Sequence, residues 1–237
     1  MKILAIADQE NQRIWSSYKP KELREPDLIL SAGDLDPDYL QFCVTYARSP
    51  VFYIHGNHDE RYQQKPPEGC VCVEDDIVVY QGIRILGLGG CMRYRPGAYQ
   101  YTERQMRRRI RHLWLKLRSY GGFDILLTHA PAAGYHDSDD PNDRCHHGFA
   151  VFNELIEKYE PRFHIHGHIH MNYNIPAPVI SQRQQTTVIN ASGGTVHFVY
   201  EQERAAEAAA GIIQPVSDLP AFSQTEPEQS AVHIETI

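Results

Sequence analysis

Side chains that bind metals or transfer protons follow five short apolar runs of this chain. A lone residue of this kind is more often a turn residue, a helix cap or a hydrogen-bonded structural residue. Five groups in succession favour one shared site, because ligands of open α/β sheets bind at the carboxyl ends of the strands. The groups are Asp8 and Glu10; Gly33-Asp34; Gly56-Asn57-His58-Asp59; His129; and Gly167-His168-Ile169-His170.

The donor types in these groups suit the hydrolysis of phosphate esters on metal ions. Carboxylates, an amide oxygen and imidazole nitrogens together favour borderline to hard divalent ions such as Mn, Fe or Zn. A carboxylate can bridge two such ions roughly 3.5–4 Å apart, and the pair can activate water and hold both the attacking and the leaving oxygen of a phosphate ester. A further histidine that binds no metal is then able to protonate the leaving group.

Spacing alone does not identify every ligand. The four histidines between residues 163 and 170 would all face one side of a continuous strand, since side chains alternate with a period of two. Asp8 and Glu10 share one side in the same way if their strand continues.

Hydrophobic periodicity predicts the elements that position these groups. Apolar runs that end in Gly, Asp or His predict strands, and the amphipathic stretches between them predict helices. The alternation is typical of an α/β domain with helices packed on sheet. The expected strands are 2–7, 27–33, 50–56, 83–90, 124–130 and 163–170, the expected helices are 37–49, 102–122 and 149–161, and a hairpin-like pair is expected at 186–194 and 195–201.

The periodic pattern ends near residue 202. One domain is therefore expected over residues 1–200, followed by a C-terminal helix and a loosely held tail over 201–237. The whole chain has 237 residues, which is enough to bury a sizeable core.

The net charge and the cysteines limit the classes of binding partner and the cellular compartment that we expect. The formal charge of −7 disfavours a nucleic-acid or anionic-membrane coat, and the arginines of 104–111 would spread over a solvated helix face. No apolar stretch approaches the ~20 residues of a membrane span, and the first apolar run is too short for a signal peptide. Five scattered cysteines favour reduced thiols and a cytoplasmic protein. The expected partner is a small phosphate-ester substrate, and the oligomeric state is left open.

In their order along the chain, the five groups resemble the calcineurin-like metallophosphoesterases, and most of all small bacterial members of phosphodiesterase type. The match spans residues 8–170, and the combination is specific although each motif alone is weak. The resemblance implies an α/β fold of two stacked mixed β-sheets flanked by helices, a four-layer sandwich with the metals at the strand ends.

The resemblance also implies a dinuclear centre in which Asp34 bridges two divalent ions. The other ligands divide between the ions, Asp8 and His170 on the first and Asn57, His129 and His168 on the second. His58 would be the general acid, with Asp59 orienting its imidazole. The implied reaction is attack of a metal-bound hydroxide on a phosphate ester, more readily a phosphodiester than a monoester.

Glu10 departs from the family pattern, which opens with Asp-x-His and uses that histidine as a ligand. As an oxygen donor in its place, Glu10 would favour a harder first ion, so Mn is expected ahead of Fe or Zn. If Glu10 points to solvent instead, the first ion binds weakly or not at all. Pro37 also replaces an acidic residue of the family. The alternative function is a non-catalytic scaffold on the same fold with a weakened first metal site.

Two polar loops are candidates for substrate contact. Arg93 and Arg95, in the run 91–101, are able to bind a phosphate through charge-assisted hydrogen bonds, and the tyrosines beside them to stack on a base or an aryl group. His146 or His147, in the polar loop 134–148, is expected at the rim of the pocket. Both loops are also consistent with an ordinary surface.

Overall fold

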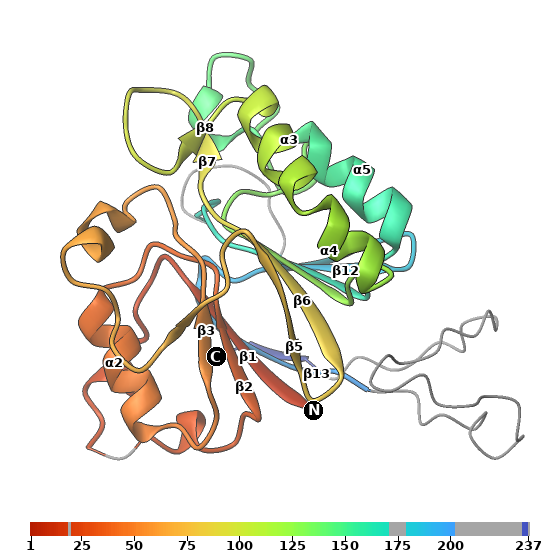
Figure 1. Ribbon diagram of the computed structural model, residues 1–237. Coiled ribbons are helices and arrows are strands. Elements are labelled where there is room, and N and C mark those ends of the chain that lie inside the picture. The colour runs from red at the N-terminus through yellow and green to blue at the C-terminus, as the bar shows by residue number, and fades with distance from the viewer. Residues whose placement is uncertain (19, 171–178, 202–233, 237) are drawn as a thin grey trace, which may run out of the picture.

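The computed structural model describes residues 1–18, 20–170, 179–201 and 234–236, which form two six-stranded sheets with helices on both sides (Figure 1). The first sheet consists of β1 (Lys2–Ala7), β2 (Leu28–Ser31), β3 (Val51–Tyr53), β4 (Val71–Cys72), β13 (Gly194–Val199) and β14 (Ile234–Thr236). Its strand order is β14-β13-β1-β2-β3-β4. The strands β1 to β4 run parallel, whereas β13 is antiparallel to both β1 and β14.

The second sheet consists of β5 (Asp76–Tyr80), β6 (Ile83–Leu88), β9 (Ile125–Thr128), β10 (Phe163–His166), β11 (Ile180–Arg183) and β12 (Thr186–Asn190). Its order is β11-β12-β10-β9-β6-β5, with the four inner strands parallel and the two edge strands antiparallel to their neighbours. A small parallel pair, β7 (Cys91–Met92) and β8 (Gln100–Tyr101), follows the second sheet's strand β6.

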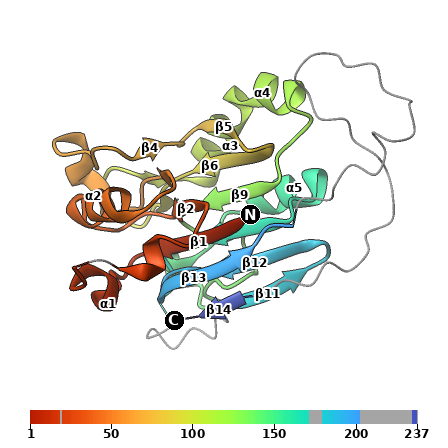
Figure 2. The same ribbon diagram turned by 90° about the horizontal axis from the view of Figure 1, so that it is seen from below.

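Helices cover the outer face of each sheet, as Figures 1 and 2 show. The first sheet carries α1 (Gln12–Trp15) and α2 (Pro37–Tyr46), and the second carries α3 (Glu103–His112), α4 (Trp114–Ser119) and α5 (Ala150–Tyr159). Short 3₁₀ turns lie at η1 (Lys21–Leu23), η2 (Asp59–Gln63) and η3 (Arg144–His146). The start of α3 is set by a capping box, in which Thr102 and Gln105 satisfy each other's backbone N–H groups.

Buried side chains fill three interfaces between four layers. Between the sheets, Ala5 and Leu30 of the first sheet pack with Ile165 of the second. The outer face of the first sheet packs on Tyr39 of α2, and that of the second sheet on Phe152 of α5. These interfaces confirm the predicted four-layer α/β sandwich. No helix in the described part of the chain is long and apolar enough to cross a membrane.

Most expected elements form, but their ends differ and the one expected strand pairing does not form. The helix expected over 102–122 is split between α3 and α4 at Leu113, whose ψ of 0° departs from helical geometry. The hairpin expected at the end of the domain is wrong, because β12 pairs with β10 and β11 while β13 pairs with β1 in the other sheet. The expected C-terminal helix falls within residues 202–233, outside the described residues, and the strand β14 comes after these residues.

Candidate metal centre

The loops that follow β1, β2, β3, β9 and β10 meet at one end of the two sheets. Within each sheet, backbone hydrogen bonds join neighbouring loops, from Asp8 N–H to Gly33 O over 3.1 Å and from Gly167 N–H to His129 O over 3.0 Å. Across the sheets, the N–H of His168 donates to Oδ2 of Asp8 over 2.8 Å. Members of all five predicted groups are therefore brought together at the ends of parallel strands in the two packed sheets.

Asp34, Asn57 and His129 present metal-binding atoms to one another. Nε2 of His129 lies 2.9 Å from Oδ1 of Asn57 and 3.3 Å from Oδ2 of Asp34. Nδ1 of His129 lies 2.8 Å from the carbonyl oxygen of Ala32, to which it donates, so Nε2 is the nitrogen that faces the centre. One ligand atom from each of Asp34, His129 and His168 lies within 4.8 Å of the other two.

His168 is held so that its second nitrogen can bind. Its Nε2 lies 2.8 Å from the carbonyl oxygen of Cys145, an acceptor, so this nitrogen carries the proton and Nδ1 keeps the lone pair. Burial lowers the pKa of His168 to about 3, which keeps the ring in the neutral form that binds metals.

Asp8 and His170 lie next to each other, and Asp8 is joined to His168. Oδ2 of Asp8 accepts the hydrogen bond from His168, while Oδ1 is buried, accepts no hydrogen bond and lies 3.4 Å from Nε2 of His170. Burial, with a smaller contribution from Asp34, raises the pKa of Asp8 to about 7, against the lowering effect of His129. A buried carboxylate oxygen without a hydrogen bond is costly unless a cation compensates it, so this residue fits a metal ligand.

The electrostatics of Asp34 and His129 also favour a positive charge between these two side chains. Burial by itself raises the pKa of Asp34, but the facing His129 and the hydrogen bond from the His58 N–H bring it below its usual range. Burial lowers the pKa of His129, yet Asp34 raises it to about 10. A proton on Nε2 of His129 therefore takes the place that a divalent ion would fill, and the residues present fit such an ion.

Three of the predicted ligands have left-handed backbone. The φ angles are 60° at Asp8, 58° at Asp34 and 69° at His168, in a region that L-residues seldom adopt. Strain of this kind persists where the surroundings enforce it and is concentrated at functional sites.

Gly56 is required by the closeness of Asp34. A Cβ atom at residue 56 would lie 2.1 Å from Oδ1 of Asp34, well inside van der Waals contact. The same oxygen accepts the N–H of His58 over 2.7 Å. The glycine therefore lets the loop after β3 close over the carboxylate that is predicted to bridge the ions.

Asp59 supports the loops and does not orient His58. Its Oδ2 accepts the N–H groups of Gly56 and Asp34 over 2.7 and 2.8 Å, and its Oδ1 is buried without a hydrogen bond. Burial and the nearby Asp34 raise the pKa of Asp59 to about 6. The expected contact with the His58 imidazole is absent, because Asp59 begins the 3₁₀ turn η2 and its carboxylate turns inward while His58 is exposed.

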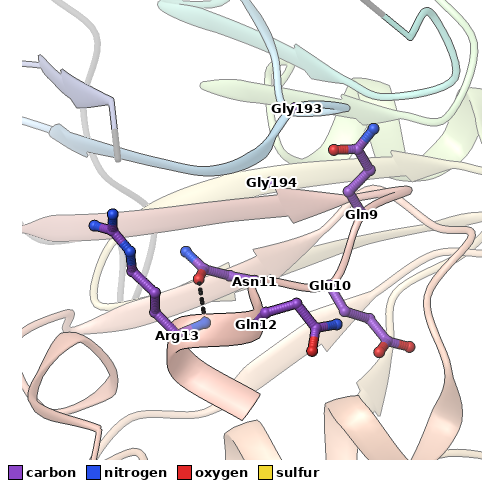
Figure 3. A pocket seen from close by; sticks show the side chains of 7 residues that line it. All are labelled: Gln9, Glu10, Asn11, Gln12, Arg13, Gly193 and Gly194. Carbon is purple, nitrogen blue, oxygen red and sulfur yellow. Dashed lines mark hydrogen bonds between the residues drawn. The ribbon is translucent and has the colours of Figure 1, made fainter. Parts of the chain in front are cut away.

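Glu10 does not reach the centre. β1 ends at Ala7, and the left-handed Asp8 is followed by a tight turn in which the Gln9 N–H bonds to the carbonyl oxygen of Ala7. The alternation that would put Asp8 and Glu10 on one side is thereby lost. Glu10 lines a different cavity of about 300 Å³, beside Gln12 of α1, and its carboxylate points away from Gln9 (Figure 3).

A second cavity, of about 210 Å³, opens onto the candidate ligands. His58 lines it from the loop after β3, Tyr94 from the loop between β7 and β8, and His146 from η3. Of the two histidines expected at the rim, His146 is thus the one at the cavity, while Nε2 of His147 contacts the carbonyl oxygen of Asp140 within its own loop. The remaining lining residues are Asp34, Asn57, Cys145, His168 and His170.

The two arginines expected to bind phosphate lie outside this cavity. The Arg93 guanidinium donates to the carbonyl oxygen of Gln100 over 3.2 and 3.3 Å, which ties β7 to β8. Arg95 is exposed, and its guanidinium lies 5.3 Å from the centre of the Tyr94 ring. In the basic run, Arg109 pairs with Glu74 and Asp75, and Arg107 pairs with Glu154.

The structure shows which histidines of residues 163–170 face the centre, a distinction that the spacing in the sequence did not allow. His164 and His166 lie within β10 and are buried against Thr128 and His136, at 2.8 and 2.9 Å. The strand ends at His166, and the left-handed His168 then turns toward the centre. Cys145 is the cavity residue that sequence reasoning missed, because a single cysteine in a polar loop carries no spacing signal.

The candidate centre lies within a part of the chain that matches a known family. The family model of the calcineurin-like phosphoesterases matches residues 7–172, which include every group described above. The chain belongs to the calcineurin-like phosphoesterase family. This is a family of metal-dependent phosphoesterases, and the predicted family is thereby confirmed.

Relatives of this calcineurin-like phosphoesterase match only in part. Human metallophosphoesterase domain-containing protein 1 is 28% identical over 130 residues, which cover 54% of this chain and 36% of the human protein. The chain thus spans about a third of that relative. Two solved structures share the fold, a phosphopantetheinyl hydrolase of Mycobacterium tuberculosis and the protein TT1561 of Thermus thermophilus. Their TM-scores are 0.55 and 0.52, at 13% and 16% identity, over 80% and 81% of this chain and 88% and 90% of theirs.

Proposed function

We propose that this chain is a dinuclear metal-dependent phosphohydrolase that prefers phosphodiesters. One observation carries the proposal. Oxygen atoms of Asp34 and Asn57 lie within 3.3 Å of Nε2 of His129, each residue comes from a separate strand end, and the buried Oδ1 of Asp8 accepts no hydrogen bond. We assign Asp34 as the bridging ligand, Asp8 and His170 to one ion, and Asn57, His129 and His168 to the other.

Bound divalent ions would supply Lewis-acid chemistry, activating water and neutralising charge on phosphate oxygens. The chain's own residues do the rest. His58 is exposed at the cavity, and its backbone N–H bond to Asp34 fixes the loop from which its imidazole can protonate the leaving oxygen. Asp59 keeps that loop in place through the Gly56 and Asp34 amides.

The preference for a diester is supported by the charge of the cavity. Its described lining residues include no arginine or lysine. A phosphomonoester carries about two negative charges near neutral pH and benefits from such cations, while a diester carries one. Tyr94 and His146 offer ring surfaces for a second ester substituent.

The metals are assigned as Mn, Fe or Zn. The preference for Mn depended on an oxygen ligand from Glu10, and Glu10 lies in the other cavity. The donors that remain, two aspartates, one asparagine and three histidines, suit all three ions. A cytoplasmic setting is part of the proposal, supported by five cysteines that all carry free thiols.

Hydrolysis of bis(p-nitrophenyl) phosphate and of p-nitrophenyl phosphate by protein reconstituted with Mn, Fe or Zn tests this assignment. The diester is expected to be the better substrate by kcat/KM. The competing proposal is a non-catalytic scaffold, favoured by the loss of Glu10 from the first site. It predicts no turnover of either ester with any of the three ions.

A further inference from the structure

Cys145, His146 and His168, which line the same cavity, form a second group of side chains that could bind a metal. One ligand atom from each lies within 4.8 Å of the other two. Sγ of Cys145 lies 3.9 Å from Nε2 of His168. The assignments above use neither the thiol nor this nitrogen, so the group is chemically separate although it shares one imidazole with the centre.

The distance between two ligand atoms of this group is close to that in a zinc site. Zinc binds sulfur at about 2.3 Å and imidazole nitrogen at about 2.0–2.1 Å in a tetrahedron, which places the two ligand atoms roughly 3.6 Å apart. The observed 3.9 Å between Cys145 Sγ and His168 Nε2 differs from this by a few tenths of an ångström. A small side-chain rotation would bring both atoms to an ion.

Asp143 orients His146, the third member of this group. Nδ1 of His146 lies 2.8 Å from Oδ1 of Asp143. Histidines that bind metals commonly donate the other ring N–H to a carboxylate, which fixes the tautomer and strengthens the ligand. Nε2 of His146 is therefore the atom that we assign to the ion. Cys145 and His146 are half-buried and line the open cavity, so an ion has a path to them.

We propose that Cys145, His146 and His168 bind a thiophilic divalent ion, Zn²⁺, at a site whose occupation excludes the second ion of the dinuclear centre. The thiol releases its proton to solvent and binds as a thiolate. A fourth position is left for water or for an ester oxygen.

The exclusion follows from the chemistry of one imidazole. A neutral ring has one N–H and one lone pair. In the structure Nε2 of His168 donates to the carbonyl oxygen of Cys145, so Nδ1 holds the lone pair for the dinuclear centre. When Nε2 binds Zn²⁺, the proton moves to Nδ1 and this ligand is lost to the second ion. Zinc in excess should then inhibit turnover, a consequence that rests on the proposed function.

Cobalt spectroscopy tests the site without any activity measurement. Co²⁺ bound to a thiolate gives a sulfur-to-cobalt charge-transfer band in the near ultraviolet, whereas Co²⁺ bound to oxygen and nitrogen donors alone gives none. Metal-free protein titrated with Co²⁺ should show the band. Cys145→Ser should lose it, and Cys72→Ser, which removes an exposed thiol on β4, should keep it.

His146→Ala is a second variant. Its Co²⁺ affinity, measured from the growth of the band during the titration, should be lower by at least about tenfold. A wild-type protein without the band, or a band that survives in Cys145→Ser, overturns the site. Zinc inhibition of the Mn-loaded enzyme, each variant compared with its own rate in Mn alone, tests the exclusion. Equal zinc sensitivity of wild type and Cys145→Ser overturns that part. A protein inactive under all ions refutes the proposed function, while the cobalt result still decides the site.

Discussion

The backbone N–H of His168 donates a hydrogen bond of 2.8 Å to Oδ2 of Asp8, across 160 positions of the sequence. Asp8 follows β1 of the first sheet and His168 follows β10 of the second. The candidate centre therefore exists only when the two sheets are packed on each other. Metal binding and sheet packing should stabilise one another, since an ion that binds only the folded state adds to its stability.

Gly167→Ala should disrupt this link. A Cβ atom at residue 167 would lie 2.3 Å from Oδ2 of Asp8 and 2.7 Å from the Cβ of Ala7, so strand ends in both sheets must shift. We expect a loss of about 1–3 kcal/mol in the free energy of unfolding, measured by chemical denaturation. Mn²⁺ affinity, measured by calorimetry, should fall with it.

Gly97→Ala is the matched control. Its added Cβ would meet the flexible end of Gln100 at 2.9 Å and Oε1 of Glu60 at an ordinary 3.5 Å, and should change stability by less than about 0.5 kcal/mol. Equal stability and equal Mn²⁺ affinity in the Gly167 and Gly97 variants would show that the approach of Gly167 to Asp8 is not needed.

Glu10→Gln should leave metal binding almost unchanged, because Glu10 lines the other cavity. Asp8→Asn should lower Mn²⁺ affinity by at least about tenfold, since it removes a buried ligand charge. Calorimetric titration of the two variants side by side measures both effects. A loss in Glu10→Gln as large as that in Asp8→Asn would place Glu10 among the ligands after all.

Metal affinity should rise with pH. In the metal-free protein Asp8 has a pKa raised to about 7, mainly by burial, and His129 has a pKa of about 10 against the effect of burial because Asp34 faces it. Both groups hold protons at pH 5, and an ion binds only as these leave. Affinity should increase by up to about tenfold per pH unit for each proton released, with the contribution of Asp8 ending near pH 7.

Titrations in two buffers of different ionisation enthalpy count the protons released. At pH 6 at least one proton should leave as the centre fills. The Asp8→Asn variant should release fewer protons than the wild type. Binding that is independent of pH between 5 and 7 would contradict the electrostatic picture of the centre.

The sequence was sufficient to place the candidate ligands that follow strands directly. Asp34 and Asn57 follow parallel strands of the first sheet and His129 follows a parallel strand of the second, so each comes to the same end of its own sheet, as expected. The position expected for Glu10 differs from the observed one, because the expectation assumed that β1 continues past Ala7. The strand ends there, and Asp8 adopts a left-handed conformation. Period-two spacing says nothing of where a strand stops.

The pairing of β13 with β1 could not be predicted from the sequence either. The two strands lie about 190 residues apart, and nothing local distinguishes a hairpin from a crossover between sheets at residues 186–199. Cys145 was missed for a similar reason, because its closeness to His168 comes only from the packing of the loop 134–148 on the strand ends. Relationships made by tertiary packing are beyond what spacing can predict.

His58→Ala should reduce turnover to below about a tenth of the wild-type rate, because a positioned general acid contributes roughly 10²–10⁴-fold. The loss should grow as the leaving group becomes more basic, since a poor leaving group depends more on protonation. A series of aryl phosphodiesters measures this dependence. His112→Ala, an exposed histidine of α3, is the control and should be unaffected. An identical leaving-group dependence in wild type and His58→Ala would remove His58 from the role of general acid.

The most direct test is the metal content and diesterase activity of Asp34→Asn beside the wild type, both reconstituted with Mn²⁺. The wild type should hold two ions per chain by elemental analysis and hydrolyse bis(p-nitrophenyl) phosphate. Asp34→Asn, with its fold verified by circular dichroism, should hold fewer than two ions and turn over below about a tenth of the wild-type rate. A wild type that binds no divalent ion and hydrolyses no phosphodiester, or an Asp34→Asn variant as active as the wild type, would contradict a dinuclear centre bridged by Asp34.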